Sequence, residues 1–202
     1  QELDVEMHRQ GVVEAARRFP GQNCEWRIYT LRGDHSASPH GNGAQTGATI
    51  QEGDGLVNII IPRLNGCTIE NERTIFCGRP SSAQEAAYDA ALQAQLAAIE
   101  AMRPGRTVCD IDNAAREVIE ARGYGDNIMH RTGHGVGMRG HEYPADTAFN
   151  PRLLMQNEVY SAEPGIYIWG LGGFRLDDTI VVADTPEVLT QTSKDIGVQT
   201  IL

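Results

Sequence analysis

The stretch HRTGHGVGMRGHEYP, residues 130–144, is the most informative part of this chain. It places His130, His134 and His141 within twelve residues and interleaves them with four glycines. Histidine is a common neutral metal ligand and the usual proton carrier near pH 7, and glycine lets other segments approach the backbone closely. This combination predicts a functional site. A glycine-rich loop with surface histidines is the competing interpretation.

Two carboxylate-bearing segments follow this stretch. Glu163 lies in YSAEPGIY, where the proline after it favours an extended backbone. Asp177 lies in GFRLDDT, where strand alternation predicts Arg175 and Asp177 on one face and Asp178 on the other. An arginine beside a carboxylate keeps it ionised, which suits a metal ligand.

Two further carboxylates, Glu70 and Glu72, lie two residues apart in TIENERT and share a face of an expected strand. Such a pair repels unless a cation or a proton lies between the two groups. The apolar run LVNIIIPRL, residues 56–64, precedes them as a buried strand, and the dipeptide Asn65-Gly66 predicts a tight hairpin.

The remaining pattern predicts an α+β fold. Helices are expected over 2–19, from Ser81 or Ser82 to Met102, and from Asp110 or Asp112 to Ala121. Strands are expected over 26–31, 56–64, 67–76, 158–169, 173–183 and 186–190. Because these elements lack a regular βαβ alternation, we expect an antiparallel or mixed sheet. The alanine-rich helix up to Met102 is expected to pack on that sheet.

Composition narrows the class of protein. The chain has 202 residues, of which 41% are hydrophobic, and we expect a single domain over residues 1–202. A net charge of −10 argues against nucleic acid as a partner. No run approaches the roughly 18 apolar residues that a membrane span needs, so no membrane partner is expected. The chain starts at Gln1, so we expect a processed chain or a piece of a longer one.

The cysteines carry no metal or redox signature. Their spacing lacks a Cys-x-x-Cys pair, which argues against a zinc knuckle and a dithiol centre. Scattered cysteines of this kind are typical of proteins in the reducing cytoplasm, which is the predicted compartment. The four are Cys24, Cys67, Cys77 and Cys109.

Taken together, the motifs GD, NG, ERT, GHGVG, EPGIY and GGFRLDDT resemble the creatinase/aminopeptidase P/prolidase family. The resemblance runs in one order over roughly residues 25–185. It implies the pita-bread fold, an α+β catalytic domain of two pseudo-symmetric halves. It also implies that part of the opening helical region and an N-terminal domain lie outside this sequence.

The resemblance implies an altered metal site. Peptidases of this family hold two divalent metals with Asp, Asp, His, Glu and Glu. Here Ile59 falls where the first aspartate is expected, and it cannot act as a ligand. The implied cofactor is therefore one divalent ion (Mn, Zn, Co or Fe) or none. Its implied ligands are Glu70, His134, Glu163 and Asp177.

The same resemblance assigns the catalytic residues. His40 and His141 match histidines that contact the substrate, and His130 matches a third histidine of the aminopeptidase P branch. Arg175 matches an arginine that supports the metal-bridging carboxylate, and Glu163 is expected to assist proton transfer.

The leading interpretation is a hydrolase similar to Xaa-Pro aminopeptidase or prolidase, which cleaves a C–N bond of a small peptide or amino-acid-like substrate. Two alternatives stay open. One is a metal-free amidinohydrolase resembling creatinase. The other is a pseudoenzyme that binds peptides or partner proteins in an inherited cleft. The family resemblance also implies a homodimer.

Overall fold

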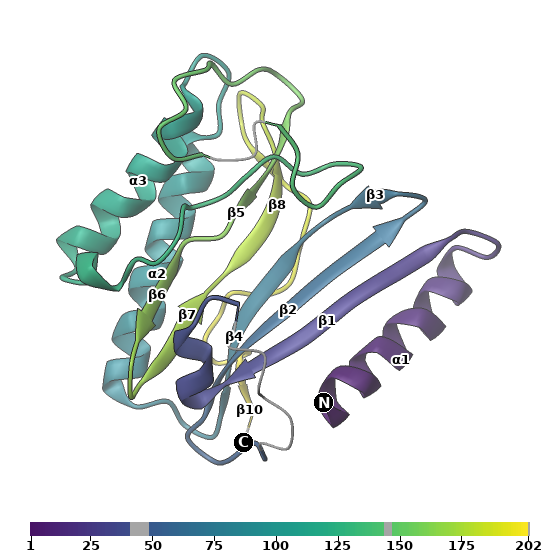
Figure 1. The fold of residues 1–202 in the computed structure, drawn as a ribbon, viewed down its shortest axis with the longest axis vertical. Coiled ribbons are helices and arrows are strands. Elements are labelled where there is room, and N and C mark those ends of the chain that lie inside the picture. The colour runs from purple at the N-terminus through teal and green to yellow at the C-terminus, as the bar shows by residue number, and fades with distance from the viewer. Residues whose placement is uncertain (41–48, 144–146, 202) are drawn as a thin grey trace.

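The computed structural model describes residues 1–40, 49–143 and 147–201 (Figure 1). The N-terminal half contains α1 (Glu2–Arg18), β1 (Cys24–Arg32), η1 (Gly33–Ala37), β2 (Gly55–Leu64), β3 (Cys67–Thr68) and β4 (Asn71–Cys77). The rest of the chain contains α2 (Ser82–Ala101), α3 (Val108–Ala121), η2 (Gly125–Asn127), β5 (Val159–Ala162), β6 (Gly165–Ile168), β7 (Gly172–Arg175), β8 (Asp177–Val181), β9 (Glu187–Val188) and β10 (Thr200–Ile201).

One mixed sheet organises the fold. Its strands follow the order β1-β2-β4-β8-β5 with antiparallel neighbours, and β10 joins β4 in parallel. Strands β6 and β7 form a separate antiparallel pair. The α+β class with a mixed sheet is confirmed.

The hairpin after β2 forms as predicted, but the returning strand is broken. Asn65 and Gly66 adopt φ values of 50° and 89°, which a two-residue hairpin loop requires. The pairing of the returning strand with β2 is then interrupted. Thr68 N donates to Gly137 O, and Glu70 N donates to Thr179 Oγ1, so neither donates to β2. The single strand expected over 67–76 is therefore divided into β3 and β4.

The predicted strands over 158–169 and 173–183 are also each divided in two. Pro164 has no N–H to donate, and Glu163 N donates to Thr132 O at 2.6 Å instead of to a neighbouring strand. This bond ties Glu163 to the histidine-rich stretch. The second predicted strand is interrupted at Leu176, between β7 and β8. Each break lies beside a residue of the candidate site.

The start of the second long helix was predicted too late. Helix α3 begins at Val108, and its N-cap is Thr107. Asp110 is therefore in the first turn, where its Oδ2 accepts a hydrogen bond from Thr107 N at 2.8 Å. Helix α2 begins as predicted, with Ser81 Oγ accepting from Gln84 N at 3.3 Å.

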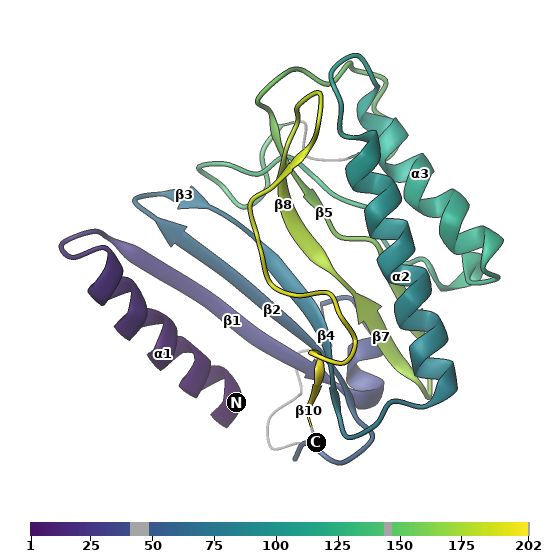
Figure 2. The same ribbon diagram turned by 180° about the vertical axis from the view of Figure 1, so that it is seen from behind.

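The main core lies between the helices and the C-terminal strands. Helices α2 and α3 lie together over β5 to β8, as Figure 2 shows from behind. Ala91, Ala94 and Ala98 of α2 are fully buried in the same cluster as Phe174 and Leu176, so the predicted packing of the alanine-rich helix is confirmed.

Strand alternation directs the functional side chains away from these helices. Because Phe174 and Leu176 face α2 and α3, Arg175 and Asp177 face the opposite side of the sheet. On β2, Asn58 Nδ2 donates to Thr30 Oγ1 at 2.9 Å on the side of α1, so Ile59 faces the same side as Asp177. Helix α1 lies alone beside β1 (Figure 1).

Candidate active site

One row of side chains crosses four strands and forms the floor of the site. Tyr29 pairs in register with Ile59, Ile59 with Glu72, and Glu72 with Asp177. Ile59 is fully buried in a small apolar cluster with Leu31 and Val57. The row therefore changes from an apolar half on β1 and β2 to an acidic half on β4 and β8.

His134 lies at the centre of the acidic half. Its Nε2 atom lies 3.2 Å from Glu70 Oε2 and 3.3 Å from Glu163 Oε1. Its Nδ1 atom donates to Gly135 O at 3.1 Å, which leaves Nε2 facing the carboxylates. Burial opposes the charged imidazole, but the contacts with Glu163 and Glu70 prevail and raise the pKa of His134 to about 10.

Asp177 is a buried carboxylate without a partner. Its side chain is fully buried, and neither oxygen accepts a hydrogen bond from any residue that the structure describes. Burial, together with the charges of Glu72, Glu163 and Glu70, raises the pKa of Asp177 well above its usual range. Because an unpaired buried carboxylate is costly, this position calls for a cation or a proton.

Arg175 pairs with Glu72. Its Nη2 lies 2.8 Å from Glu72 Oε1, and its Nε contacts Glu72 Oε2. Its Nη1 donates to Tyr167 Oη at 3.1 Å and to Pro39 O at 3.0 Å. Burial raises the pKa of Glu72 to about 7 although Arg175 opposes this shift. Glu72, the cross-strand partner of Ile59, is therefore the carboxylate that pairs with Arg175.

His130 carries a neutral imidazole and is connected to Arg175 through the hydroxyl of Tyr167. Its Nδ1 donates to Arg131 O at 2.6 Å, so its Nε2 accepts the hydroxyl proton of Tyr167 at 2.6 Å. Burial lowers the pKa of His130 to about 4. A hydrogen-bonded chain thus runs from His130 through Tyr167 and Arg175 to Glu72.

The other two predicted histidines lie nearer the opening. The His141 ring stacks on the His134 ring with 3.7 Å between centroids, and His141 Nδ1 accepts from Arg131 Nη2 at 3.3 Å. Burial lowers the pKa of both His40 and His141. A small cavity of about 50 Å³ is lined by seven of the eight predicted site residues: His40, Glu70, His130, His134, His141, Glu163 and Arg175. Asp177 lies beneath it, with a carboxylate oxygen within 4.8 Å of those of Glu72 and Glu163.

Comparison with known proteins identifies the family of this chain. Residues 1–184 match the sequence model of metallopeptidase family M24. The chain belongs to metallopeptidase family M24. The putative dipeptidase YkvY of Bacillus subtilis is 37% identical over 196 residues, which are 96% of this chain and 51% of that protein. The Xaa-Pro dipeptidase of Pyrococcus furiosus is 38% identical over 165 residues, which are 81% of this chain and 47% of that protein.

Solved structures confirm the pita-bread fold of this M24 chain. The Xaa-Pro dipeptidase from Bacillus anthracis matches with a TM-score of 0.83 and 32% identity, covering 96% of this chain and 54% of that one. The chain spans about half the length of the curated relatives named here. Among the described residues, no helix is both long and apolar enough to cross a bilayer.

This M24 site holds two groups of possible ligands for a divalent cation: Glu70, His134 and His141 in one, and Glu72, Glu163 and Asp177 in the other. Ligand atoms about 2.1 Å from a metal lie roughly 3.0–3.4 Å from one another, and the distances from His134 Nε2 to Glu70 and Glu163 match this spacing. Asp177 supplies the unpartnered buried oxygens. Ile59 offers no donor to this floor, and Arg175 contacts both oxygens of Glu72.

Two glycines of the M24 histidine stretch allow other segments to approach its backbone closely. A Cβ atom on Gly140 would lie 3.3 Å from Glu70 Oε1, so the absence of a side chain there leaves room for the longer glutamate. A Cβ atom on Gly133 would lie only 2.1 Å from Ser161 O. The segment beside His134 therefore packs directly on β5.

Sequence reasoning missed two residues that position the site. Tyr167 links His130 to Arg175, and Asp112 Oδ1 accepts from Thr132 N at 2.7 Å. The tyrosine is part of the EPGIY motif. The motif predicted that this segment belongs to the site, but it did not predict the hydrogen bonds of the tyrosine hydroxyl. Asp112 lies on α3, where no pattern connects it with the distant histidine stretch.

Proposed function

We propose that the protein is an M24 hydrolase that cleaves a C–N bond of a small peptide or amino-acid-like substrate, with one divalent cation in place of a metal pair. The convergence of Glu70, His134 and Glu163 at one cavity, with Asp177 next to Glu163, supports this proposal. We further propose that residues 1–202 act as a single catalytic domain. The names of the dipeptidases that resemble the chain favour a dipeptide substrate.

When bound, a divalent cation at these four side chains supplies Lewis acidity and lowers the pKa of water. The chain's own residues handle protons and charge. Glu163 is the group that accepts a proton from the attacking water, because its carboxylate borders the cavity. Although burial opposes the charged form, the contact with His134 lowers the pKa of Glu163 and keeps it ionised at neutral pH. His141 lies at the opening, where its imidazole stabilises the developing oxyanion.

Metal analysis and hydrolysis of Xaa-Pro dipeptides test the proposal together. We expect about one equivalent of Mn, Zn, Co or Fe per chain and release of proline that a chelator abolishes. The matched control is Glu163→Gln, which keeps the shape of the side chain and should abolish hydrolysis. Metal far below one equivalent together with intact dipeptides would overturn the proposal.

One observation favours a second candidate, a metal-free amidinohydrolase similar to creatinase. The apolar wall at Ile59 and the closed ion pair between Glu72 and Arg175 remove two oxygen donors from the floor. This candidate predicts activity on a non-peptide substrate that bears an amidine or guanidine group, unchanged by chelation. The same chelator experiment therefore separates the two functions.

A further inference from the structure

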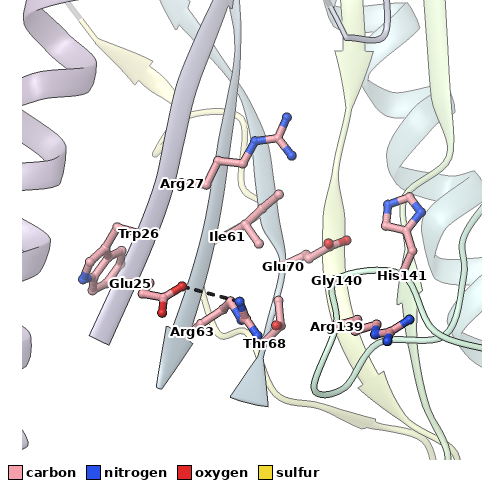
Figure 3. A pocket seen from close by; sticks show the side chains of 10 residues that line it. All are labelled: Glu25, Trp26, Arg27, Ile61, Arg63, Thr68, Glu70, Arg139, Gly140 and His141. Atoms are coloured by element: carbon pink, nitrogen blue, oxygen red, sulfur yellow. Dashed lines mark hydrogen bonds and ion pairs between the residues drawn. The ribbon is translucent and has the colours of Figure 1, made fainter. Parts of the chain in front are cut away.

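Arg73 is buried on the far face of the sheet, opposite the face on which the site opens. On the open face, Glu70 and His141 line a cavity of about 380 Å³ between the ends of β1 and β2 and residues 139–141 (Figure 3). Arg73 follows Glu72 on β4, so strand alternation turns its side chain away from that cavity. Arg73 is 3% exposed and borders neither cavity of the site. Any effect of Arg73 on the chemistry must therefore act through other residues.

The partner of Arg73 is Asp178, which follows Asp177 on β8. Arg73 Nη2 donates to Asp178 Oδ1 at 2.7 Å, and the Asp178 side chain is fully buried. Strand alternation places Asp178 on the face opposite Asp177. A buried ion pair therefore lies behind the acidic half of the floor.

All five N–H groups of Arg73 have acceptors, and two of these acceptors are backbone oxygens of the floor. Arg73 Nη1 donates to Glu72 O at 2.7 Å and to Asp177 O at 2.8 Å. The other three N–H groups reach the carboxylate of the ion pair and the carbonyl oxygens of Thr192, at 2.7 Å, and Ser193, at 3.2 Å. A guanidinium offers five donors in one plane, and no other side chain can supply this set.

The two bonds from Arg73 Nη1 bridge β4 and β8 where the pairing of these strands is short. The strands pair at two positions, Asn71 with Asp178 and Glu72 with Asp177. The second pair carries two carboxylates that belong to one group of possible metal ligands. Because Nη1 binds one carbonyl oxygen on each strand, Arg73 fixes the distance between the peptide units from which both carboxylates extend.

The C-terminal segment, yellow in Figure 2, crosses the far face of the sheet. It is anchored at the same carboxylate, because Lys194 Nζ lies 2.6 Å from Asp178 Oδ2 and Thr190 Oγ1 donates to Asp178 Oδ1 at 2.6 Å. Lys194 O accepts from Tyr88 Oη of α2 at 3.0 Å. Two cations thus meet one buried carboxylate. Of these two, Arg73 is the one that hydrogen-bonds the backbone of the floor within the part of the chain that the structure describes.

We propose that Arg73 is a positioning residue of the site. From the far face it sets the spacing of the Glu72 and Asp177 carboxylates, and it ties this spacing to residues 190–194 of the C-terminal segment. The inference rests on the proposed function, because the spacing matters for a cation that these acids bind. Groups that orient metal ligands typically change metal affinity by about 10–100-fold. The C-terminal segment is therefore part of the framework of the site.

Binding of Co²⁺ separates positioning from charge. The variants Arg73→Met and Lys194→Met each remove one cation from the Asp178 carboxylate. Loss of a positive charge favours binding of a cation, whereas loss of ligand position weakens it. We therefore expect the Kd for Co²⁺, measured by competition with a chromophoric chelator, to rise at least about tenfold in Arg73→Met and not to rise in Lys194→Met. Arg73→Lys keeps the charge but has three donors, so it should weaken Co²⁺ binding as well.

Hydrogen exchange of the metal-free protein measures the same effect without any ligand. In Arg73→Lys, the backbone amides of β4, β8 and residues 190–194 should exchange several-fold faster than in the wild type, while those of α3 should keep the wild-type rate. Lys194→Met should accelerate exchange in residues 190–194 and leave β4 and β8 unchanged.

Two results would overturn the positioning role. One is unchanged or tighter Co²⁺ binding by folded Arg73→Lys, and the other is an acceleration of exchange that includes α3 to the same degree. A wild-type protein that binds no Co²⁺ would instead refute the proposed function. The exchange experiment then tests Arg73 by itself, and faster exchange confined to β4, β8 and residues 190–194 supports the proposal.

Discussion

Ile59 on β2 and Glu72 on β4 are cross-strand partners, and the Glu72 carboxylate is held by Arg175. The row that crosses the floor thus has an apolar side chain in one strand and a carboxylate in the next. The Glu72 carboxylate thus pairs with a buried guanidinium and also lies in a group with Glu163 and Asp177 whose ligand atoms are within 4.8 Å of one another.

The first prediction restores a carboxylate in this row. Ile59→Asp should raise bound Mn²⁺ from about one to about two equivalents per chain, because a two-metal clamp becomes available. In metal-free buffer the same change should lower the free energy of unfolding by about 1–3 kcal/mol, since the new carboxylate is buried. Ile59→Asn is the matched neutral control. Plasma emission analysis and urea denaturation measure the two effects. An unchanged metal content would refute the prediction.

The second prediction concerns the buried ion pair. Glu72→Gln should reduce the free energy of unfolding by about 3–5 kcal/mol, because the Arg175 guanidinium is left buried without a countercharge. The double variant Glu72→Gln/Arg175→Met should be less destabilised than the sum of the two single variants. Urea denaturation of all four proteins measures the coupling. Additive effects would show that the pair is not an energetic unit.

The third prediction is a pH dependence of stability. The pKa of His130 is about 4 in the folded chain, against an ordinary value of 6.5. Between these values the unfolded chain binds a proton that the folded chain does not. The stability contribution of His130 is therefore fully present above about pH 6.5 and is lost as the pH falls toward 4, by on the order of 1–3 kcal/mol.

The variant His130→Gln isolates this contribution. It removes the titrating group and keeps a side chain that accepts a hydrogen bond from Tyr167. The difference in unfolding free energy between pH 7.5 and pH 5, measured in urea, should be smaller in the variant than in the wild type. An identical difference in both proteins would mean that His130 is protonated in the folded chain.

The fourth prediction tests the close packing beside His134. Gly133→Ala places a Cβ atom 2.1 Å from Ser161 O, so the backbone must shift, and we expect a loss of about 1–3 kcal/mol. Gly55→Ala is the matched control, because its Cβ atom finds ordinary contacts at 3.8 Å and 3.9 Å. Thermal unfolding measures both variants. Equal midpoints would contradict the close approach.

Much of the site could be predicted from the sequence because motifs and alternation are local properties. A strand places residues two positions apart on the same face, so the pairs Glu70/Glu72 and Arg175/Asp177 could be read directly. The structure places His134 Nε2 at 3.2 Å from Glu70 Oε2 and at 3.3 Å from Glu163 Oε1. The breaks at Glu70 and Glu163 were missed, since they depend on hydrogen bonds to Thr179 and Thr132.

By itself, the sequence determined the family and the α+β class, because both depend on which residue occupies which place in a motif. Only the tertiary structure decided that Arg175 pairs with Glu72 and that Tyr167 links Arg175 to His130. These relationships join strands and loops that are far apart along the chain, so their energies depend on burial and distance that arise only when the sheet assembles.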